Sequence, residues 1–221
     1  MSAAPKRCLV LNPNTTGSVT ELVRSACQRA QPGITWQGAT ARFGAAYIAD
    51  EAAFEQARPA VLDAFDAFYD GHDAVLLACF GDPGLQALQR RSPVPVIGLA
   101  HASFEAASRH GRFAVVTGGH AWEPMLERFA RDNRLDARLA GIFTIDWTGA
   151  QIAADPDGAR DALVAAAQQG IDRGAECILL GGAGLAGLAG PLQPRLAVPV
   201  LDNVELAARA VAHALEAPRR P

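Results

Sequence analysis

One cysteine stands where its side chain could do chemistry. The stretch LLACFGDPGL, residues 76–85, is an apolar run that reaches Cys79 and continues into glycine, aspartate and proline. A thiol at the end of a strand and near a helix N-terminus has a lowered pKa and reacts as a thiolate. Asp82, directly before Pro83, is expected to cap the following helix and to bring its positive end near the thiol. Cys79 is therefore the first candidate for a catalytic residue.

The other three cysteines have the pattern of core residues. Cys8 and Cys177 lie inside apolar runs, and Cys27 lies on the apolar stripe of an expected helix. No C-x-x-C spacing occurs, so neither a zinc ribbon nor a redox pair is indicated. We expect all three to be small buried hydrophobic residues.

Short Val/Leu/Ile runs alternate with alanine-rich amphipathic stretches along the chain. Continuously apolar strands that alternate with helices predict an α/β fold with a parallel sheet covered on both faces. The expected strands are residues 8–11, 34–37, 74–78, 95–98, 113–117, 138–145, 177–180 and 198–201. The expected helices are residues 18–29, 51–69, 84–89, 102–109, 121–131, 156–173 and 204–215.

Three pairs of segments repeat in the same order along the chain. RCLVLNPNTTGSV (7–19) resembles RFAVVTGGHAWEP (112–124), and AVLLACFGDPGL (74–85) resembles CILLGGAGLAGL (177–188). VPVIGLAHASFEAA (94–107) likewise resembles VPVLDNVELAARA (198–210). The repeat predicts two pseudo-symmetric lobes, each a mainly parallel sheet flanked by helices, with the active site in the cleft between them. We expect residues 1–100 plus 204–221 to form the first lobe and residues 101–203 the second.

The turns after the matched strands carry small, amide and hydroxyl side chains. Sites in α/β proteins form at the carboxyl ends of the strands, so these turns are expected to line the shared cleft. Their backbone N–H groups could hold a carboxylate or an imide oxygen. Besides Cys79, the residues expected there are Asn12, Asn14, Thr15, Phe80, Gly81, Thr117, Gly118, Gly119, Gly182 and Ala183.

The composition narrows the classes of function. The 221 residues are 50% hydrophobic and carry a formal net charge of −3, which gives no basic patch for nucleic acid. Lys6 is the single lysine, which argues against Schiff-base chemistry with pyridoxal phosphate. No apolar run approaches the ~18 residues of a membrane span, and the first residues have too short an apolar core for a signal peptide. We therefore expect a cytoplasmic protein that acts on a small molecule.

Several segments together resemble the hydantoin racemases of the Asp/Glu racemase superfamily. They are LNPNTT after the first strand, ACFGDPGL after the third, PVIGLAHASFEAA after that, and the late GAECILLGGAGLAGLAG and VPVLDNVELAARAVAHAL. The resemblance implies an isomerase without metal or cofactor that moves a proton at the carbon next to a carbonyl of a small carboxylate or hydantoin. It also implies that the loop FGAAYIADEA, with Tyr47 and Ile48, covers the substrate. We further expect a homo-oligomer.

The family uses two cysteines, of which this chain keeps one. In the family, one thiolate removes the Cα proton and the other thiol delivers a proton to the opposite face, as a matched acid–base pair. Cys79 matches the first cysteine. The second family motif reads roughly Leu-Gly-Cys-Ala-Gly-Met, and here LGGAGL, residues 180–185, puts Gly182 at the position of the second thiol. The internal repeat also pairs Cys79 with Gly182.

The missing thiol leaves several hypotheses open. A water or another residue could serve the second face, and His120, just after the Thr117 turn, is a candidate. A chain with one thiol could instead be a decarboxylase of a malonate-type substrate, as in the arylmalonate decarboxylases of the same superfamily. It could also be a non-catalytic binder of a small ligand.

Other ligand classes have weaker support. GAGLAG, residues 182–187, has the form G-x-G-x-x-G after a strand, and Asp202 ends the next strand, which makes NAD binding a remote alternative. The following helix would end at Gly190-Pro191, too short for a dinucleotide fold. The five histidines are scattered and indicate no metal site. Arg42 is expected to be an exposed loop residue rather than a ligand of a carboxylate.

Overall fold

The computed structural model describes residues 4–217, and all eight expected strands are present in it. The strands are β1 (Lys6–Asn12), β2 (Ile34–Thr40), β3 (Ala74–Leu77), β4 (Val96–Gly98), β5 (Phe113–Gly118), β6 (Leu139–Ile145), β7 (Cys177–Leu180) and β8 (Val200–Asp202). The helices are α1 (Gly17–Ala30), α2 (Glu51–Phe68), α3 (Leu85–Arg91), α4 (Leu99–Ser108), α5 (Trp122–Asp132), α6 (Gly149–Ala154), α7 (Pro156–Asp172), α8 (Ala189–Leu192) and α9 (Asn203–Glu216). The short helices α6 and α8 were not expected from the sequence, and α4 begins three residues earlier than expected.

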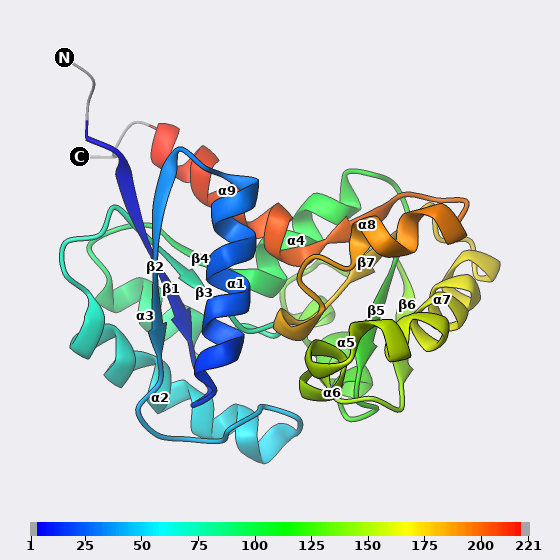
Figure 1. Ribbon diagram of the computed structural model, residues 1–221, viewed down its shortest axis with the longest axis horizontal. Coiled ribbons are helices and arrows are strands. Elements are labelled where there is room, and N and C mark those ends of the chain that lie inside the picture. Colours follow the sequence, from blue (N-terminus) through cyan, green and yellow to red (C-terminus); the bar gives the residue numbers. More distant parts are fainter. Residues whose placement is uncertain (1–3, 218–221) are drawn as a thin grey trace.

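The strands form two parallel sheets with the same internal order (Figure 1). The first sheet has the order β2-β1-β3-β4 and the second the order β6-β5-β7-β8. Each strand of the second sheet therefore occupies the place of the strand four positions earlier in the first. The prediction of an α/β fold with two pseudo-symmetric lobes is confirmed.

The continuous apolar strands are buried because helices cover both faces of each sheet. Successive side chains of a strand point to opposite faces. In β1, Leu9 and Leu11 pack in a core that includes residues of α2, whereas Cys8 and Val10 pack in a core that includes residues of α1, α4 and α9. The core that contains Cys8 and Val10 also contains Val115 of the other sheet, so one apolar cluster joins the two lobes.

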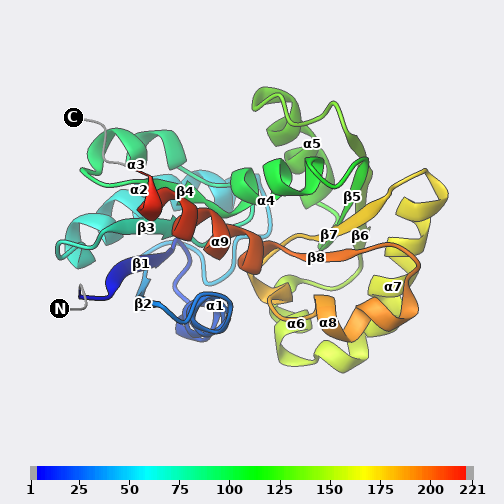
Figure 2. The ribbon, with the colours of Figure 1, turned by 90° about the horizontal axis from the view of Figure 1, so that it is seen from above.

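The carboxyl-terminal helix α9 follows the second sheet but packs against the first. It contacts α1 and α4 and the strands β3 and β4, and Figure 2 shows it running back from β8 towards β4. None of the helices in the described part of the chain combines the length and apolar character that a bilayer crossing requires.

Asp82 caps a different helix from the one expected. Its carboxylate accepts hydrogen bonds from the backbone N–H groups of Ala100 (3.0 Å) and His101 (2.7 Å), at the start of α4. The helix α3 begins after Gly84 without a side-chain cap. The reason is that α4 follows Gly98, which has no capping side chain, and the Asp82 carboxylate occupies the space where a Cβ at Gly98 would lie.

In the second lobe, the last residue of the strand itself caps the following helix. Asp202, at the repeat position of Gly98, accepts hydrogen bonds from the N–H groups of Val204 (2.9 Å) and Glu205 (3.2 Å) at the start of α9. Its other oxygen accepts from the N–H of Gly187 (2.5 Å), in the turn after β7. In both lobes, one buried carboxylate thus links the turn after the third strand to the helix after the fourth.

We expect the replacement Gly98→Ala to destabilise the protein by about 1–3 kcal/mol, because the new methyl group would overlap the Asp82 carboxylate and the Leu85 side chain. Urea denaturation measures the free energy of unfolding. Gly17→Ala is the matched control, since no described atom lies within 4 Å of its Cβ position. A Gly98→Ala protein as stable as the wild type would contradict this close packing.

Asp82 also gives the stability a defined pH dependence. Burial raises the pKa of Asp82 to about 7, although hydrogen bonds from backbone N–H groups lower it. The unfolded value is about 3.9, so the folded protein holds this proton more tightly. The resulting stabilisation is complete below about pH 4 and is lost as the pH rises through about 7.

The variant Asp82→Asn lacks this titration. The difference in the free energy of unfolding between the wild type and Asp82→Asn (wild type minus variant) should therefore fall as the pH rises from about 4 to about 7. Urea denaturation at a series of pH values checks this. Asp155→Asn, an exposed cap of α7, is the control. A difference that stays constant over this pH range would refute the account.

Candidate active site

A small cavity lies where the carboxyl ends of the two sheets face each other. Its volume is about 30 Å³, the space of roughly one water molecule. Residues that follow β1, β3, β5 and β7 line it, so both lobes contribute. The lining residues are Asn14, Val19, Tyr47, Ile48, Ala78, Cys79, Phe80, Thr117, Trp122, Gly182 and Ala183.

Eight of the residues expected from the sequence line this one cavity. They are Asn14, Tyr47, Ile48, Cys79, Phe80, Thr117, Gly182 and Ala183. Sequence reasoning missed Val19, Ala78 and Trp122. A signal for Trp122 was present, since it is the aromatic residue that follows the glycine turn after β5 and begins α5.

Five other expected residues do not line the cavity. Asn12 is fully buried and supports Asn14, whose Oδ1 accepts from the Asn12 side-chain amide (2.9 Å) and whose N–H donates to Asn12 Oδ1 (3.1 Å). Thr15 is exposed, and its N–H donates to the carbonyl of Ala45 (3.1 Å). The remaining three are glycines that pack against neighbouring segments: Gly81, Gly118 and Gly119.

Cys79 and Gly182 occupy equivalent places in the two lobes. Each stands two residues after the end of its strand, β3 or β7. The carbonyl of Cys79 accepts from the N–H of Asp82 (3.1 Å), and the carbonyl of Gly182 accepts from the N–H of Leu185 (3.1 Å). The backbone hydrogen bonds thus repeat, and the side chains differ.

The backbone at Gly182 is adapted to glycine. Its φ of 129° lies in a region that L side chains rarely adopt. Space is not the obstacle, because a Cβ there would lie 3.2 Å from Leu185 Cδ1 and 3.7 Å from Thr117 Oγ1. The backbone conformation at position 182 therefore favours glycine over a residue with a side chain.

Phe80, next to Cys79, fixes the two site turns against each other. Its ring fills the space where a side chain at Gly181 would lie. On its other side the ring packs on Phe104 of α4, with ring centroids 5.7 Å apart, and Phe104 contacts Phe113 of β5 at 5.5 Å. Cys79 and Gly182 are therefore held across the cavity by an aromatic cluster that spans both lobes.

The electrostatics of Cys79 differ from the expectation. Burial raises the pKa of the Cys79 thiol, and the negative charge of Asp82 raises it further. The expected lowering by a helix N-terminus is wrong, because the thiol is buried and lies near the Asp82 carboxylate, which caps α4. In the closed cavity, the raised pKa favours the neutral thiol.

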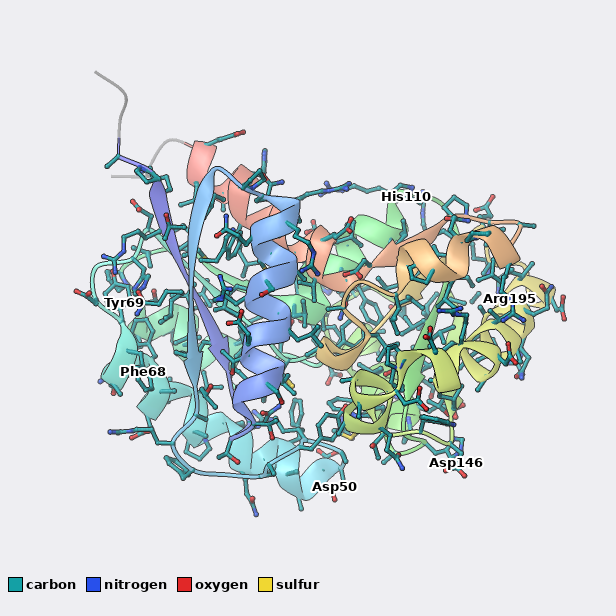
Figure 3. All side chains as sticks on the ribbon, in the orientation of Figure 1. Asp50, Phe68, Tyr69, His110, Asp146 and Arg195 are labelled. Carbon is teal, nitrogen blue, oxygen red and sulfur yellow. The ribbon has the colours of Figure 1, made fainter. Side chains whose placement is uncertain are left out.

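Tyr47 reaches from the first lobe to the second. Its loop is held by Thr16, whose Oγ1 donates to the carbonyl of Ala46 (2.5 Å), and ends at Asp50, which caps α2 and is labelled in Figure 3. The Tyr47 hydroxyl packs against Gly149, the first residue of α6, where a side chain would overlap it. Burial, and then the negative charge of Cys79, raise the pKa of Tyr47 to about 12.

Two polar groups of the cavity have hydrogen-bonding capacity left for a ligand. Asn14 uses its Oδ1 within the protein, whereas its Nδ2 has no hydrogen-bond partner among residues 4–217. Thr117 is nearly buried, and its hydroxyl also has no partner in the described part of the chain. Both can donate to a carbonyl oxygen on which negative charge develops.

Three residues considered in the alternative hypotheses have interaction partners away from the cavity. His120 is exposed, and its Nδ1 lies 2.7 Å from Thr144 Oγ1. Arg42 forms an exposed ion pair with Asp63. Asp202 uses both carboxylate oxygens on backbone N–H groups, which leaves it unsuited to bind a ribose. Among residues 4–217, no group of three or more His, Cys, Asp or Glu side chains is placed to hold a metal ion.

Comparison with known proteins adds to this geometry. The sequence model of the family described as Asp/Glu/Hydantoin racemase matches residues 8–211. The hydantoin racemase of Paenarthrobacter aurescens is 33% identical, over 92% of this chain and 88% of its own length. The allantoin racemase structure from Pseudomonas fluorescens aligns with a TM-score of 0.89 and 30% identity, over 97% of this chain and 98% of that one.

A more distant structure shares the architecture. Arylmalonate decarboxylase aligns with a TM-score of 0.67 and 17% identity, over 98% of this chain and 96% of that one, a likeness that shows the fold alone. The match of the family model and the identity to the hydantoin racemase both extend over most of the sequence. This chain belongs to the Asp/Glu/hydantoin racemase family.

Proposed function

We propose that this protein racemises a hydantoin or a related small cyclic amide by proton transfer at the carbon next to a carbonyl, with Cys79 as an acid–base group. The observation that carries the proposal is the single thiol in a cavity between two pseudo-symmetric lobes, beside unpaired hydrogen-bond donors. The similarity to a named hydantoin racemase and a named allantoin racemase supports the substrate class.

The cavity residues can divide the chemistry among them. The Cys79 thiolate takes the proton from the substrate carbon, and the electron pair moves onto the neighbouring carbonyl oxygen. The amide of Asn14 and the hydroxyl of Thr117 can donate hydrogen bonds to that oxygen and stabilise the enolate. A proton then returns to the carbon, and its return from the opposite face inverts the centre.

Substrate entry requires the cavity to open. Its volume of about 30 Å³ is far below the roughly 300–1,000 Å³ of ligand sites. The loop that carries Tyr47 and Ile48 closes one side, so its displacement is the simplest route of entry. Because burial is the main cause of the raised pKa of Cys79, hydration of the open site would favour the thiolate.

The other hypotheses have less support. The likeness to arylmalonate decarboxylase is low in sequence, and nothing in the cavity favours a second carboxylate on the substrate. The Asp202 carboxylate is engaged within the protein, which argues against NAD. A purely binding role leaves the placement of the thiol unexplained.

We also propose the wider organisation that the sequence suggested. The contacts of α9 with β3 and β4 support a first lobe of residues 1–100 plus 204–221 and a second of residues 101–203. Residues 1–3 and 218–221 of this division lie outside the described residues. The four free cysteines are in keeping with a reducing cytoplasm. A homo-oligomer stays part of the proposal.

The replacement Cys79→Ser tests the role of the thiol. We expect exchange of the Cα hydrogen of a chiral 5-alkylhydantoin or of allantoin with deuterium oxide to fall at least about 100-fold, because a serine hydroxyl is a much weaker acid than a thiol and does not ionise to act as the base. Proton NMR follows the exchange. Cys27→Ala, a buried cysteine away from the cavity, is the control. Unchanged exchange in Cys79→Ser would exclude Cys79 as the base.

A further inference from the structure

Racemisation in both directions requires an acid–base group on each face of the planar intermediate. In this chain Gly182 offers no side chain on the face opposite Cys79. We propose that the Tyr47 hydroxyl is the second acid–base group and acts on that face. This inference rests on the proposed racemase function and names the group that completes it.

The cavity contains two titratable side chains. Of the eleven residues that line it, Cys79 and Tyr47 alone carry a proton that can be lost and regained in enzymes. Thr117 lies close to the vacant position, with its Oγ1 3.7 Å from a Cβ built on Gly182, but an aliphatic hydroxyl does not titrate. His120, the other candidate from the sequence, lies outside the lining and is bound to Thr144.

The Tyr47 hydroxyl is held on the side of the second lobe. It packs against Gly149 at the start of α6, and Gly149 in turn packs on the turn after β7. The Cα of Gly149 lies 3.2 Å from a Cβ built on Gly184, two residues after Gly182. Cys79 follows β3 of the first sheet, whereas the Tyr47 hydroxyl lies against α6, which follows β6 of the second sheet, so the two groups approach the cavity from different sheets.

The local structure is shaped to receive this hydroxyl. A side chain at Gly149 would overlap the Tyr47 oxygen, so the glycine makes the approach possible. The first turn of α6 is fixed by a capping box, in which Thr148 and Gln151 satisfy each other's backbone N–H groups. The Tyr47 hydroxyl is thereby packed against a fixed helix end.

The thiol and the phenol can act as a matched acid–base pair. Burial, and then the negative charge of a Cys79 thiolate, raise the pKa of Tyr47, so the phenol keeps its proton when the thiolate forms beside it. The thiolate takes the Cα proton, and the Tyr47 O–H gives its proton to the opposite face of the enolate. The products are a neutral Cys79 thiol, a Tyr47 phenolate and the inverted substrate. The mirror-image substrate runs the same steps backwards, with no other reactant needed.

The replacement Tyr47→Phe removes the hydroxyl and keeps the ring. Each enantiomer of a chiral 5-alkylhydantoin is incubated in deuterium oxide, and both exchange and inversion are followed by NMR and chiral chromatography. We expect racemisation to fall at least about 100-fold. The enantiomer whose Cα hydrogen faces Cys79 should still exchange with retention, within about threefold of its wild-type rate, whereas the other enantiomer should become inert.

Tyr69→Phe is the matched control, since the chain has two tyrosines. Tyr69 follows α2, at the opposite end of that helix from Asp50 (Figure 3), and donates to the carbonyl of His72. It should leave both enantiomers within about twofold of the wild type.

Two results would overturn the role of Tyr47. One is racemisation by Tyr47→Phe at the wild-type rate. The other is an equal loss of exchange and inversion for both enantiomers, since that pattern indicates substrate binding or loop closure alone. Absence of exchange in the wild-type protein with every hydantoin tested would instead refute the proposed function, and this inference with it.

Discussion

The packing of Phe80 against Gly181 is the contact on which the site depends. It brings the turn after β3 against the turn after β7, and the Phe104 cluster behind it ties both turns to the core shared by the lobes. The geometry of a site between two lobes depends on the contact that sets the distance between them. Here that contact is one residue away from Cys79 and one residue away from Gly182.

Desolvation is the second constraint. Burial is the largest cause of the raised pKa values of Cys79 and Tyr47, which line the site, and of Asp82, which lies three residues after Cys79. The raised values favour the neutral forms of these groups when the site is closed. A closed site of this kind protects an enolate from solvent. In the proposed function, the thiolate forms in the open or substrate-bound site, so displacement of the Tyr47 loop would precede proton transfer.

The repeat and the apolar runs were enough to predict the two sheets, the positions of Cys79 and Gly182, and several cavity residues. The signal was strong because buried parallel strands are continuously apolar, and their ends are marked by glycine and asparagine. The partner of Asp82 could not be predicted in the same way. Its choice of α4 over α3 depends on Gly98 lying beside it, which is a property of the fold rather than of the local sequence.

The location of the Tyr47 hydroxyl was hidden for the same reason. The sequence marks the loop, but the contact of its hydroxyl with Gly149 joins residues about a hundred positions apart, and the reason for a glycine at 149 appears only when the ring is in place. Trp122 was overlooked because an aromatic residue at the start of an amphipathic helix is as typical of a core as of a site.

Inversion by this pair requires the substrate carbon to lie between the Cys79 thiol and the Tyr47 hydroxyl. A crystal structure of the Cys79→Ser protein with a hydantoin bound would show this arrangement. The ring carbon that bears the side chain should lie about 3–4 Å from the hydroxyl introduced at position 79 and from Tyr47 Oη, on opposite faces of the ring. A hydantoin bound with Tyr47 on the same face as position 79, or with no polar group on the opposite face, would contradict it.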